Sequence, residues 1–225
     1  MAKRPIFIPN INGNQLFMEE NIDFNWFSGF AVSQKQKSIE SLHKKAYEKG
    51  YEKLLEVSSK SSELLGQRLS AFSLEIETKN YGKISVECAF QGSKVFKGNK
   101  QYPEIYTKTS IEAKRFHKLN SSGELIGFKF EDEEWELEPK SAFYDWLYIK
   151  ALYPHKDFLK KLYKYQAFTD IEFNPVKSIN CQARTCAIIV SLLKRDLYDE
   201  AMSSKKRFIE IIYKRQLKQG ELFCL

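Results

Sequence analysis

The sequence predicts an α+β fold: one mostly helical domain over residues 1–225, with a few short strands. Apolar residues recur at helical spacing over long stretches, whereas strict alternation is confined to short ones. The chain has 225 residues, 43% of them hydrophobic, which is enough for one ordinary domain with a sizeable core. No internal repeat and no low-complexity linker divides it.

The first quarter of the chain predicts extended structure followed by a helix. Residues 5–9 (PIFIP) form a short extended segment whose prolines suit a sheet edge. Residues 10–14 (NINGN) have turn chemistry, and residues 16–30 predict a strand and then a loop. Gly50 weakens the far end of a helix expected over residues 34–55, where four side chains recur at helical spacing: Ile39, Leu42, Ala46 and Tyr47.

Shorter elements fill the rest of the chain. Helices are expected over residues 85–96 and 110–119, followed by a pair of strands or a hairpin over residues 124–137. Residues 169–174 (TDIEFN) alternate with the strand period and end at Pro175. The last third of the chain also predicts four helices: 142–152, 157–165, 183–202 and 205–217.

Composition and charge limit the functional class. The net charge of +7 favours nucleic acid or other anionic partners, although the basic residues are scattered. No apolar run could act as a signal segment or span a bilayer, so we expect a cytoplasmic protein with reduced cysteines. Metal-ligand spacings are absent, and so are the phosphate-loop, dinucleotide, serine-hydrolase and zinc-peptidase motifs, so these enzyme classes have no support.

Three polar side chains stand out in the helix predicted over residues 85–96. Glu87, Gln91 and Lys94 are spaced i, i+4 and i+7, which places them on one face with mostly apolar neighbours. Burying a carboxylate and an ammonium is costly unless they are paired or functional, and desolvation would shift both pKa values toward those needed for acid–base or amine chemistry. The alternative, which periodicity alone favours, is an exposed stripe with a solvated Glu and Lys.

A second polar cluster is expected on the strand over residues 169–174. Alternation turns two apolar side chains toward the core and puts Asp170, Glu172 and Asn174 together on the other face. Two carboxylates and an amide in this position could hold a ribose diol or act as an acid–base pair. A half-exposed strand with its polar residues outward explains the pattern equally well.

Basic residues give two hypotheses for phosphate binding. Residues 177–184 lead into a helix whose first backbone amides, together with Arg184, could bind a phosphate. Lys35 and Lys37, with His43 one or two turns further on, could also contact phosphates. A polar loop and a charged helix start, both solvated, account for the same patterns.

These stretches, in this order and spacing, resemble the NADAR (YbiA-like) N-glycosidase family over roughly residues 55–200, which leaves residues 1–54 as an N-terminal extension. Leu69-Ser70-Ala71-Phe72 and then Val86-Glu87 through Lys94 are similar to its L-S-N-F element and its V-E-x-x-x-Q-x-x-K helix. Asp145-Trp146-Leu147 through Leu152 looks like its tryptophan helix, and residues 171–175 like its V-E-x-S-P strand. Other marks resemble the branch of NADAR antitoxins associated with a DarT-type toxin: Arg4-Pro5, Gly29-Phe30 before Gln34-Lys35-Gln36-Lys37, and residues 89–94 and 168–172.

The resemblance implies an enzyme that removes ADP-ribose from guanine bases in DNA, as antitoxin to a DNA ADP-ribosyltransferase toxin. It implies that no metal or cofactor is needed, and it carries the catalytic glutamate to Glu87 and the helix lysine to Lys94. Glu87 would stabilise the oxocarbenium charge or activate water, and Lys94 would attack the anomeric carbon as an amine or stay charged to bind phosphate or orient Glu87. Asp170 and Glu172 would hold the ribose hydroxyls, and one aromatic residue would stack on a base: Trp26, Phe72 or Trp146.

Two other functions remain open. A related N-glycosidase could act on a small metabolite, such as an intermediate of riboflavin synthesis, although the basic balance mildly favours DNA. The chain could also be a non-catalytic antitoxin that binds DNA or the toxin, although the polar stripe on an otherwise apolar helix speaks against this.

Overall fold

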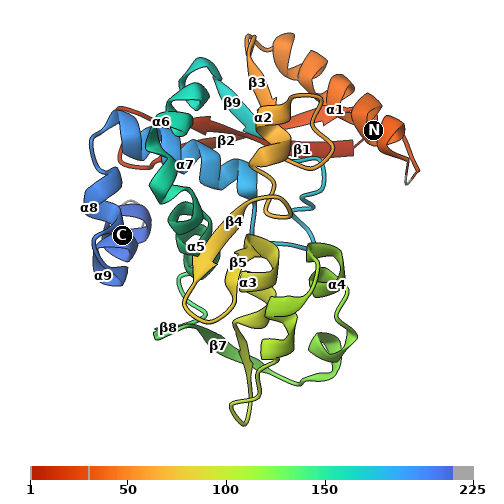
Figure 1. Cartoon of the computed structure of the whole chain (residues 1–225). Coiled ribbons are helices and arrows are strands. Elements are labelled where there is room, and N and C mark those ends of the chain that lie inside the picture. Colours follow the sequence, from red (N-terminus) through yellow and green to blue (C-terminus); the bar gives the residue numbers. More distant parts are fainter. Residues whose placement is uncertain (1, 30, 215–225) are drawn as a thin grey trace, which may run out of the picture. The chain divides into compact units, whose positions relative to one another are not determined.

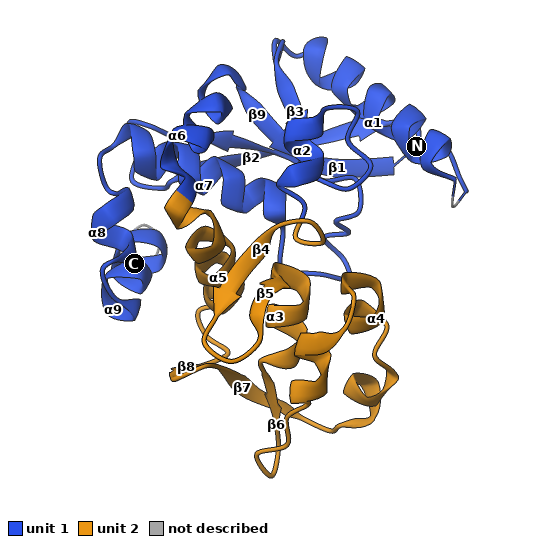
Figure 2. Cartoon of the chain, viewed as in Figure 1, with its two compact units in different colours: residues 1–70, 155–225 blue, residues 71–154 orange. Residues whose placement is uncertain are grey.

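The computed structural model describes residues 2–29 and 31–214 (Figure 1). Helices and short strands in three mixed or antiparallel sheets confirm the predicted α+β class. The chain packs into two compact units, residues 1–70 with 155–225 and residues 71–154 (Figure 2). That both units form one domain stays a prediction. Within the described residues, no helix is both long enough and apolar enough to cross a membrane.

The first unit is built on a four-stranded sheet of order β2-β1-β9-β3. Strand β1 (Ala2–Pro9) pairs along its whole length with the antiparallel β2 (Phe17–Phe24). It also pairs with β9 (Ala167–Thr169), which runs parallel to β3 (Leu54–Glu56). The predicted edge position of β1 is therefore wrong. The contact with β9 falls at Phe7, between the two prolines, so neither proline interrupts that pairing.

Two predicted helices of this unit end earlier than expected. Helix α1 (Val32–Tyr47) begins where expected but stops before Gly50, whose φ of 96° breaks the helix, and residues 54–56 form β3 instead. The helix expected over residues 183–202 divides at Asp196, with a φ of 55°, into α7 (Gln182–Lys194) and α8 (Tyr198–Met202). The boundary between the units falls within the short helix η3 (Tyr153–His155). Shorter helices complete the first unit: α2 (Leu64–Arg68), α6 (Lys156–Leu159), η4 (Lys160–Lys164), α9 (Lys205–Ile209) and η5 (Glu210–Lys214).

The core of this unit joins the sheet to α1. Apolar residues of β1 and β2, such as Ile6 and Ile22, pack against Ile39 and Leu42 of α1. Helix α7 packs on β1 and β9 and runs along the sheet in Figure 1. The last part of the helix predicted over residues 205–217, and Phe30 of the Gly29-Phe30 mark, lie outside the described residues.

The second unit holds the other two sheets. Strands β4 (Glu75–Thr78) and β5 (Gly82–Ser85) form an antiparallel pair. Strands β6 (Lys94–Phe96), β7 (Leu125–Phe130) and β8 (Glu133–Trp135) form an antiparallel sheet, which confirms the hairpin predicted over residues 124–137. The helices are α3 (Val86–Gly92), η1 (Pro103–Thr107), α4 (Ser110–Lys114), η2 (His117–Ser121) and α5 (Ala142–Leu152). Helix α5 has the predicted bounds, and nearly all of its residues are buried.

Candidate active-site residues

Glu87 lies in the first turn of α3 and is only 8% exposed. Ser85 caps the helix by accepting a hydrogen bond from the Cys88 amide at 3.1 Å, and the Glu87 amide donates to the Ala71 carbonyl at 3.0 Å. The Gln91 side chain donates to a Glu87 carboxylate oxygen at 3.0 Å. Burial raises the pKa of Glu87, while this hydrogen bond, Lys114 and Lys94 lower it. The carboxyl is therefore held in a fixed position and is largely desolvated.

Lys94 does not lie on the helix of Glu87 as predicted. Helix α3 ends at Gly92, Ser93 caps it, and Lys94 begins β6 because residues 94–96 pair with β7. The two side chains still interact. Burial lowers the pKa of Lys94, while the charge of Glu87 raises it. Its Nζ atom also lies 5.4 Å from the centre of the Phe90 ring. A partly desolvated lysine of this kind reaches its neutral, nucleophilic form at lower pH than a solvated one.

Lys114 of α4 is a member of this cluster that the sequence interpretation missed. It lowers the pKa of Glu87, and its Nζ atom lies 5.0 Å from the centre of the Phe72 ring. Ser110, at the start of the same helix, donates to the Phe72 carbonyl at 2.9 Å. Phe72 therefore lies beside the Glu87 cluster, defined here as Phe72, Glu87, Gln91, Lys94 and Lys114. The only signal in the sequence was a short helix over residues 110–119, where a lysine is typical of a solvated surface.

Trp146 lies in the core of the second unit. It is 6% exposed, and its ring lies 5.1 Å from Trp135 and 6.2 Å from Phe143. The Nζ atom of Lys150 lies 4.4 Å from the same ring. These contacts and the burial of the indole show Trp146 packed in the core, and its part in stacking on a base stays a prediction, as does that of Phe72.

The predicted strand over residues 169–174 is wrong. Strand β9 ends at Thr169, and Asp170 accepts hydrogen bonds from the amides of Glu172 and Phe173 at 3.0 and 3.2 Å, which turns the chain. Asn174 makes a second turn by accepting from the Val176 amide at 3.1 Å. Asp170, Glu172 and Asn174 therefore do not line one strand face as predicted.

Glu172 instead meets Lys35, which the sequence suggested only as a phosphate contact. The two side chains form an ion pair at 3.6 Å, and that of Lys35 is 17% exposed. Lys35 Nζ lies 4.7 Å from the centre of the Trp26 ring, and Arg4 Cζ lies 5.4 Å from the same ring. Both cations therefore lie near the ring of Trp26, the other candidate for stacking on a base. Lys37 is exposed on α1.

Glu56, at the end of β3, is a buried carboxylate that the sequence interpretation missed. It is 3% exposed and accepts three hydrogen bonds, from the Ser58 and Thr169 hydroxyls at 2.6 Å each and from the Ile171 amide at 2.8 Å. Burial raises the pKa of Glu56 above its ordinary value. Burial, and after it the charge of Glu56, raises the pKa of Asp170 well above its ordinary value. Glu56 lies one residue beyond the helix expected over residues 34–55, where no strand was predicted, so no sequence pattern indicated its burial.

His43 and Arg184 lie near these acids with different roles from those expected. The His43 ring shares a hydrogen bond of 2.8 Å with the Thr169 hydroxyl, and burial lowers its pKa to about 4, so it is neutral at pH 7. Arg184 donates to the Ile179 carbonyl at 3.3 Å in the first turn of α7. Burial, and to a lesser extent the charge of Asp170, raises the pKa of the neighbouring Cys181 thiol well above its ordinary value. In the described part of the chain, no group of His, Cys, Asp and Glu side chains is arranged to hold a metal ion.

Comparison with known families agrees with this fold. The chain matches a NADAR family model, and the members of the NADAR family are generally N-glycosidase-like hydrolases. The chain belongs to the DarT1-associated NADAR antitoxin family, whose model matches residues 2–221 and so includes both units. This membership supports an antitoxin role in association with a DarT1 toxin. No curated protein matches the chain.

Proposed function

We propose that the protein is an ADP-ribosylglycohydrolase that removes ADP-ribose from guanine bases in DNA, and so reverses the damage made by a DNA ADP-ribosyltransferase toxin. The observation that carries the proposal is the Glu87 cluster: a buried carboxyl held by Gln91, with Lys94 and Lys114 near enough to lower its pKa. Family membership supports the antitoxin part of the proposal.

In the proposed reaction, the bond between the anomeric carbon and the base nitrogen breaks, and its electron pair leaves with guanine. The anomeric carbon gains oxocarbenium character, which the negative charge of Glu87 stabilises. Water then supplies the new hydroxyl and gives its proton to Glu87, whose raised pKa favours accepting it. Glu87 passes this proton to the base nitrogen, so that guanine leaves as a neutral base and the carboxylate is restored. Lys94 has two possible roles: its neutral amine attacks the anomeric carbon first, or its charge orients Glu87 and a phosphate.

The first unit supplies candidates for binding ADP-ribose. Asp170 and Glu172 are proposed to hold ribose hydroxyls, with Asn174 in the following turn, and Arg184 a phosphate. Trp26 of the first unit and Phe72 of the second unit are the proposed surfaces for stacking on adenine or the modified base. Lys35, which is largely buried beside Glu172 and Trp26, is a second candidate for contacting a phosphate.

The test is release of ADP-ribose from an ADP-ribosylated oligonucleotide by purified protein. Glu87→Gln and Lys94→Ala should each reduce turnover at least a hundredfold, the usual contribution of a positioned acid–base group. The matched controls are Glu77→Gln and Lys97→Ala, which change exposed residues of the same unit and should leave turnover unchanged. Turnover close to wild type in both Glu87→Gln and Lys94→Ala would refute the mechanism.

The same variants separate the alternatives. If Glu87→Gln still protects cells from the toxin, the protein acts by contact with DNA or the toxin. If wild-type protein cleaves a small N-glycoside of the riboflavin pathway but not modified DNA, the substrate is a metabolite. Lys35→Ala, compared with Lys94→Ala, shows which lysine the reaction requires.

A further inference from the structure

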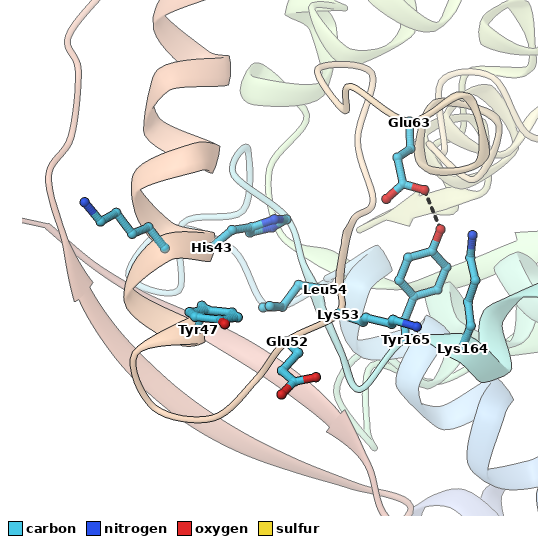
Figure 3. Close-up of a pocket in the computed structure, with 9 residues that line it drawn as sticks. His43, Tyr47, Glu52, Lys53, Leu54, Glu63, Lys164 and Tyr165 are labelled. Carbon is cyan, nitrogen blue, oxygen red and sulfur yellow. Dashed lines mark hydrogen bonds between the residues drawn. The ribbon is translucent and has the colours of Figure 1, made fainter.

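A pocket of about 510 Å³ lies in the first unit, and Glu56, Asp170 and Glu172 are not among the residues that line it. Its walls come from the last turns of α1, the chain leading into β3, the residue before α2 and the end of η4 (Figure 3). This volume is within the range of about 300–1,000 Å³ that is typical of small-molecule sites. The residues lining the pocket are His43, Lys44, Tyr47, Glu52, Lys53, Leu54, Glu63, Lys164 and Tyr165.

Hydrogen bonds between its walls keep the pocket open. The Gln166 side chain accepts from the amides of Glu52 and Lys53 at 2.7 and 3.0 Å, and the Gln166 amide donates to the Lys53 carbonyl at 2.8 Å. On the other wall, the Tyr165 hydroxyl donates to Glu63, as Figure 3 shows. A ligand would therefore meet a largely preformed site and would lose little binding energy in ordering it.

The pocket carries an excess of positive charge. Lys44, Lys53 and Lys164 have no ion-pair partner within residues 2–29 and 31–214. The next two lysines along α1 differ, because Lys45 pairs with Glu48 at 2.6 Å and Lys49 with Glu20 at 2.7 Å. His43 adds no charge at pH 7, because burial holds its pKa at about 4. The pocket is also lined by Glu52 and by Glu63, which accepts from Tyr165, so three lysines and two glutamates leave a net charge of +1. Three ammonium groups without ion-pair partners favour an anionic ligand.

The pocket also offers an aromatic surface. The side chain of Tyr47 is 63% exposed, on the α1 side of the pocket, whereas Lys53, Lys164 and Tyr165 lie on the opposite side (Figure 3). An exposed aromatic ring facing lysines is the arrangement by which proteins bind nucleotides, since the base stacks on the ring and the lysines contact the phosphate.

We infer that this pocket binds a nucleotide, with its phosphate at Lys53 and Lys164 and its base against Tyr47. The nucleotide is either one unit of a single strand of nucleic acid or a free nucleotide, because both present the same chemistry to the pocket. The inference does not depend on the proposed glycosidase activity.

The test measures binding of a fluorescein-labelled oligothymidylate of about ten nucleotides to the whole protein, by fluorescence anisotropy, between about 50 and 200 mM salt. Lys53→Ala/Lys164→Ala should weaken binding about tenfold and reduce the salt slope by about 0.7, since the two lysines contact one phosphate and each phosphate contact on a single strand contributes about 0.7. Tyr47→Ala should also weaken binding about tenfold, and Tyr47→Phe should leave it unchanged. The matched controls are Lys45→Ala and Lys49→Ala, whose lysines lie in ion pairs outside the pocket.

Competition identifies the source of the ligand. Displacement by thymidine monophosphate at similar concentration indicates a free-nucleotide site, whereas displacement only by unlabelled oligothymidylate indicates a strand. Acetylation of lysines, read by mass spectrometry, should show protection of Lys53 and Lys164 but not of Lys49 by either ligand.

Three outcomes would overturn the inference: no binding of either ligand by wild type, affinity of the double variant within twofold of wild type, or equal displacement by an acidic peptide. Glu77→Gln, which changes an exposed residue of the second unit, should bind the oligothymidylate as wild type does, and catalysis is read separately from release of ADP-ribose. Failure of the proposed catalysis and failure of this site are therefore distinguished by separate measurements.

Discussion

Replacing Glu56 with alanine should lower the free energy of unfolding, because three buried hydrogen-bond donors lose their acceptor. The donors are the hydroxyls of Ser58 and Thr169, each 2.6 Å from a carboxylate oxygen, and the amide of Ile171, at 2.8 Å. A buried donor left without an acceptor costs about 1–3 kcal/mol, with the lower value for hydroxyls, which rotate toward other acceptors. The three together cost about 4 kcal/mol.

Part of this cost is offset. Glu56 and Asp170 are buried near each other, and removing one carboxylate relieves its desolvation and its repulsion of the other by about 1–2 kcal/mol. The net loss for Glu56→Ala is then about 2–3 kcal/mol, or a fall in Tm of about 5–10 °C for a chain of this length. Glu56→Gln keeps the volume and one acceptor oxygen, so its cost should be about 1 kcal/mol or less.

The assay is urea denaturation followed by circular dichroism, with thermal melting as a second measurement. Glu52→Ala is the matched control: Glu52 is an exposed glutamate four residues away, and its loss should change stability by less than about 0.5 kcal/mol. If Glu56→Ala were as stable as this control, the three hydrogen bonds would not hold the turn at Asp170, and the argument would fail.

The pH dependence gives a second check on the same carboxylates. Their pKa values are raised in the folded state, so the stability they contribute is full below the unfolded value of about 4 and is lost as the pH rises through the folded values. Glu56→Gln should therefore flatten the decline of stability above pH 4. An unchanged decline would show that the pair does not titrate as its burial requires.

Three further predictions concern other residues. The pKa of His43 is lowered from 6.5 to about 4, so the stability it contributes is full above pH 6.5 and falls by up to about 3 kcal/mol as the pH drops to 4. His43→Gln should therefore make the free energy of unfolding less sensitive to acid. An unchanged loss of stability below pH 6.5 would contradict this prediction. Gly92→Ala should lower the free energy of unfolding by about 1–3 kcal/mol in the same assay, since the added Cβ atom would lie 2.4 Å from the ring of Tyr106. A neutral effect would show that the ring moves freely. Lys114→Ala removes a cation that lowers the pKa of Glu87, so the acid limb of the pH–rate profile for ADP-ribose release should move to higher pH, and a shift to lower pH would refute the assigned charge effect.

Local sequence signals predicted the elements whose pattern is set by neighbours along the chain. The hairpin of β7 and β8 and the bounds of α5 agree with the pattern, and α1 begins within two residues of its expected start. In these elements a continuous run of residues determines both the hydrogen bonding and the buried face, so the period of apolar residues is sufficient information.

Tertiary pairing overrode the pattern elsewhere. Lys94 continues the helical spacing of Glu87 and Gln91, but its backbone pairs with Phe128, a residue far away in the sequence, and so belongs to β6. The alternation over residues 169–174 suits a strand, yet Asp170 accepts two backbone amides within three residues, which favours a turn. A short alternating run with an aspartate near its start is compatible with a strand and with a turn, and periodicity alone does not distinguish the two.

The turn of the first unit that contains Asp170 and Glu172 depends on the register in which β3 pairs with β9. These strands pair in parallel, with Leu54 opposite Ala167 and Glu56 opposite Thr169. Because side chains alternate along a strand, a slip of one residue would move Glu56 to the opposite face and leave the Thr169 hydroxyl and the Ile171 amide without this acceptor. The hydrogen bonds that fix the register therefore also fix the backbone from which Asp170 and Glu172 project. If these two residues hold the ribose hydroxyls as proposed, Glu56 acts as a positioning residue, and Glu56→Gln should raise KM for modified DNA more than it lowers kcat.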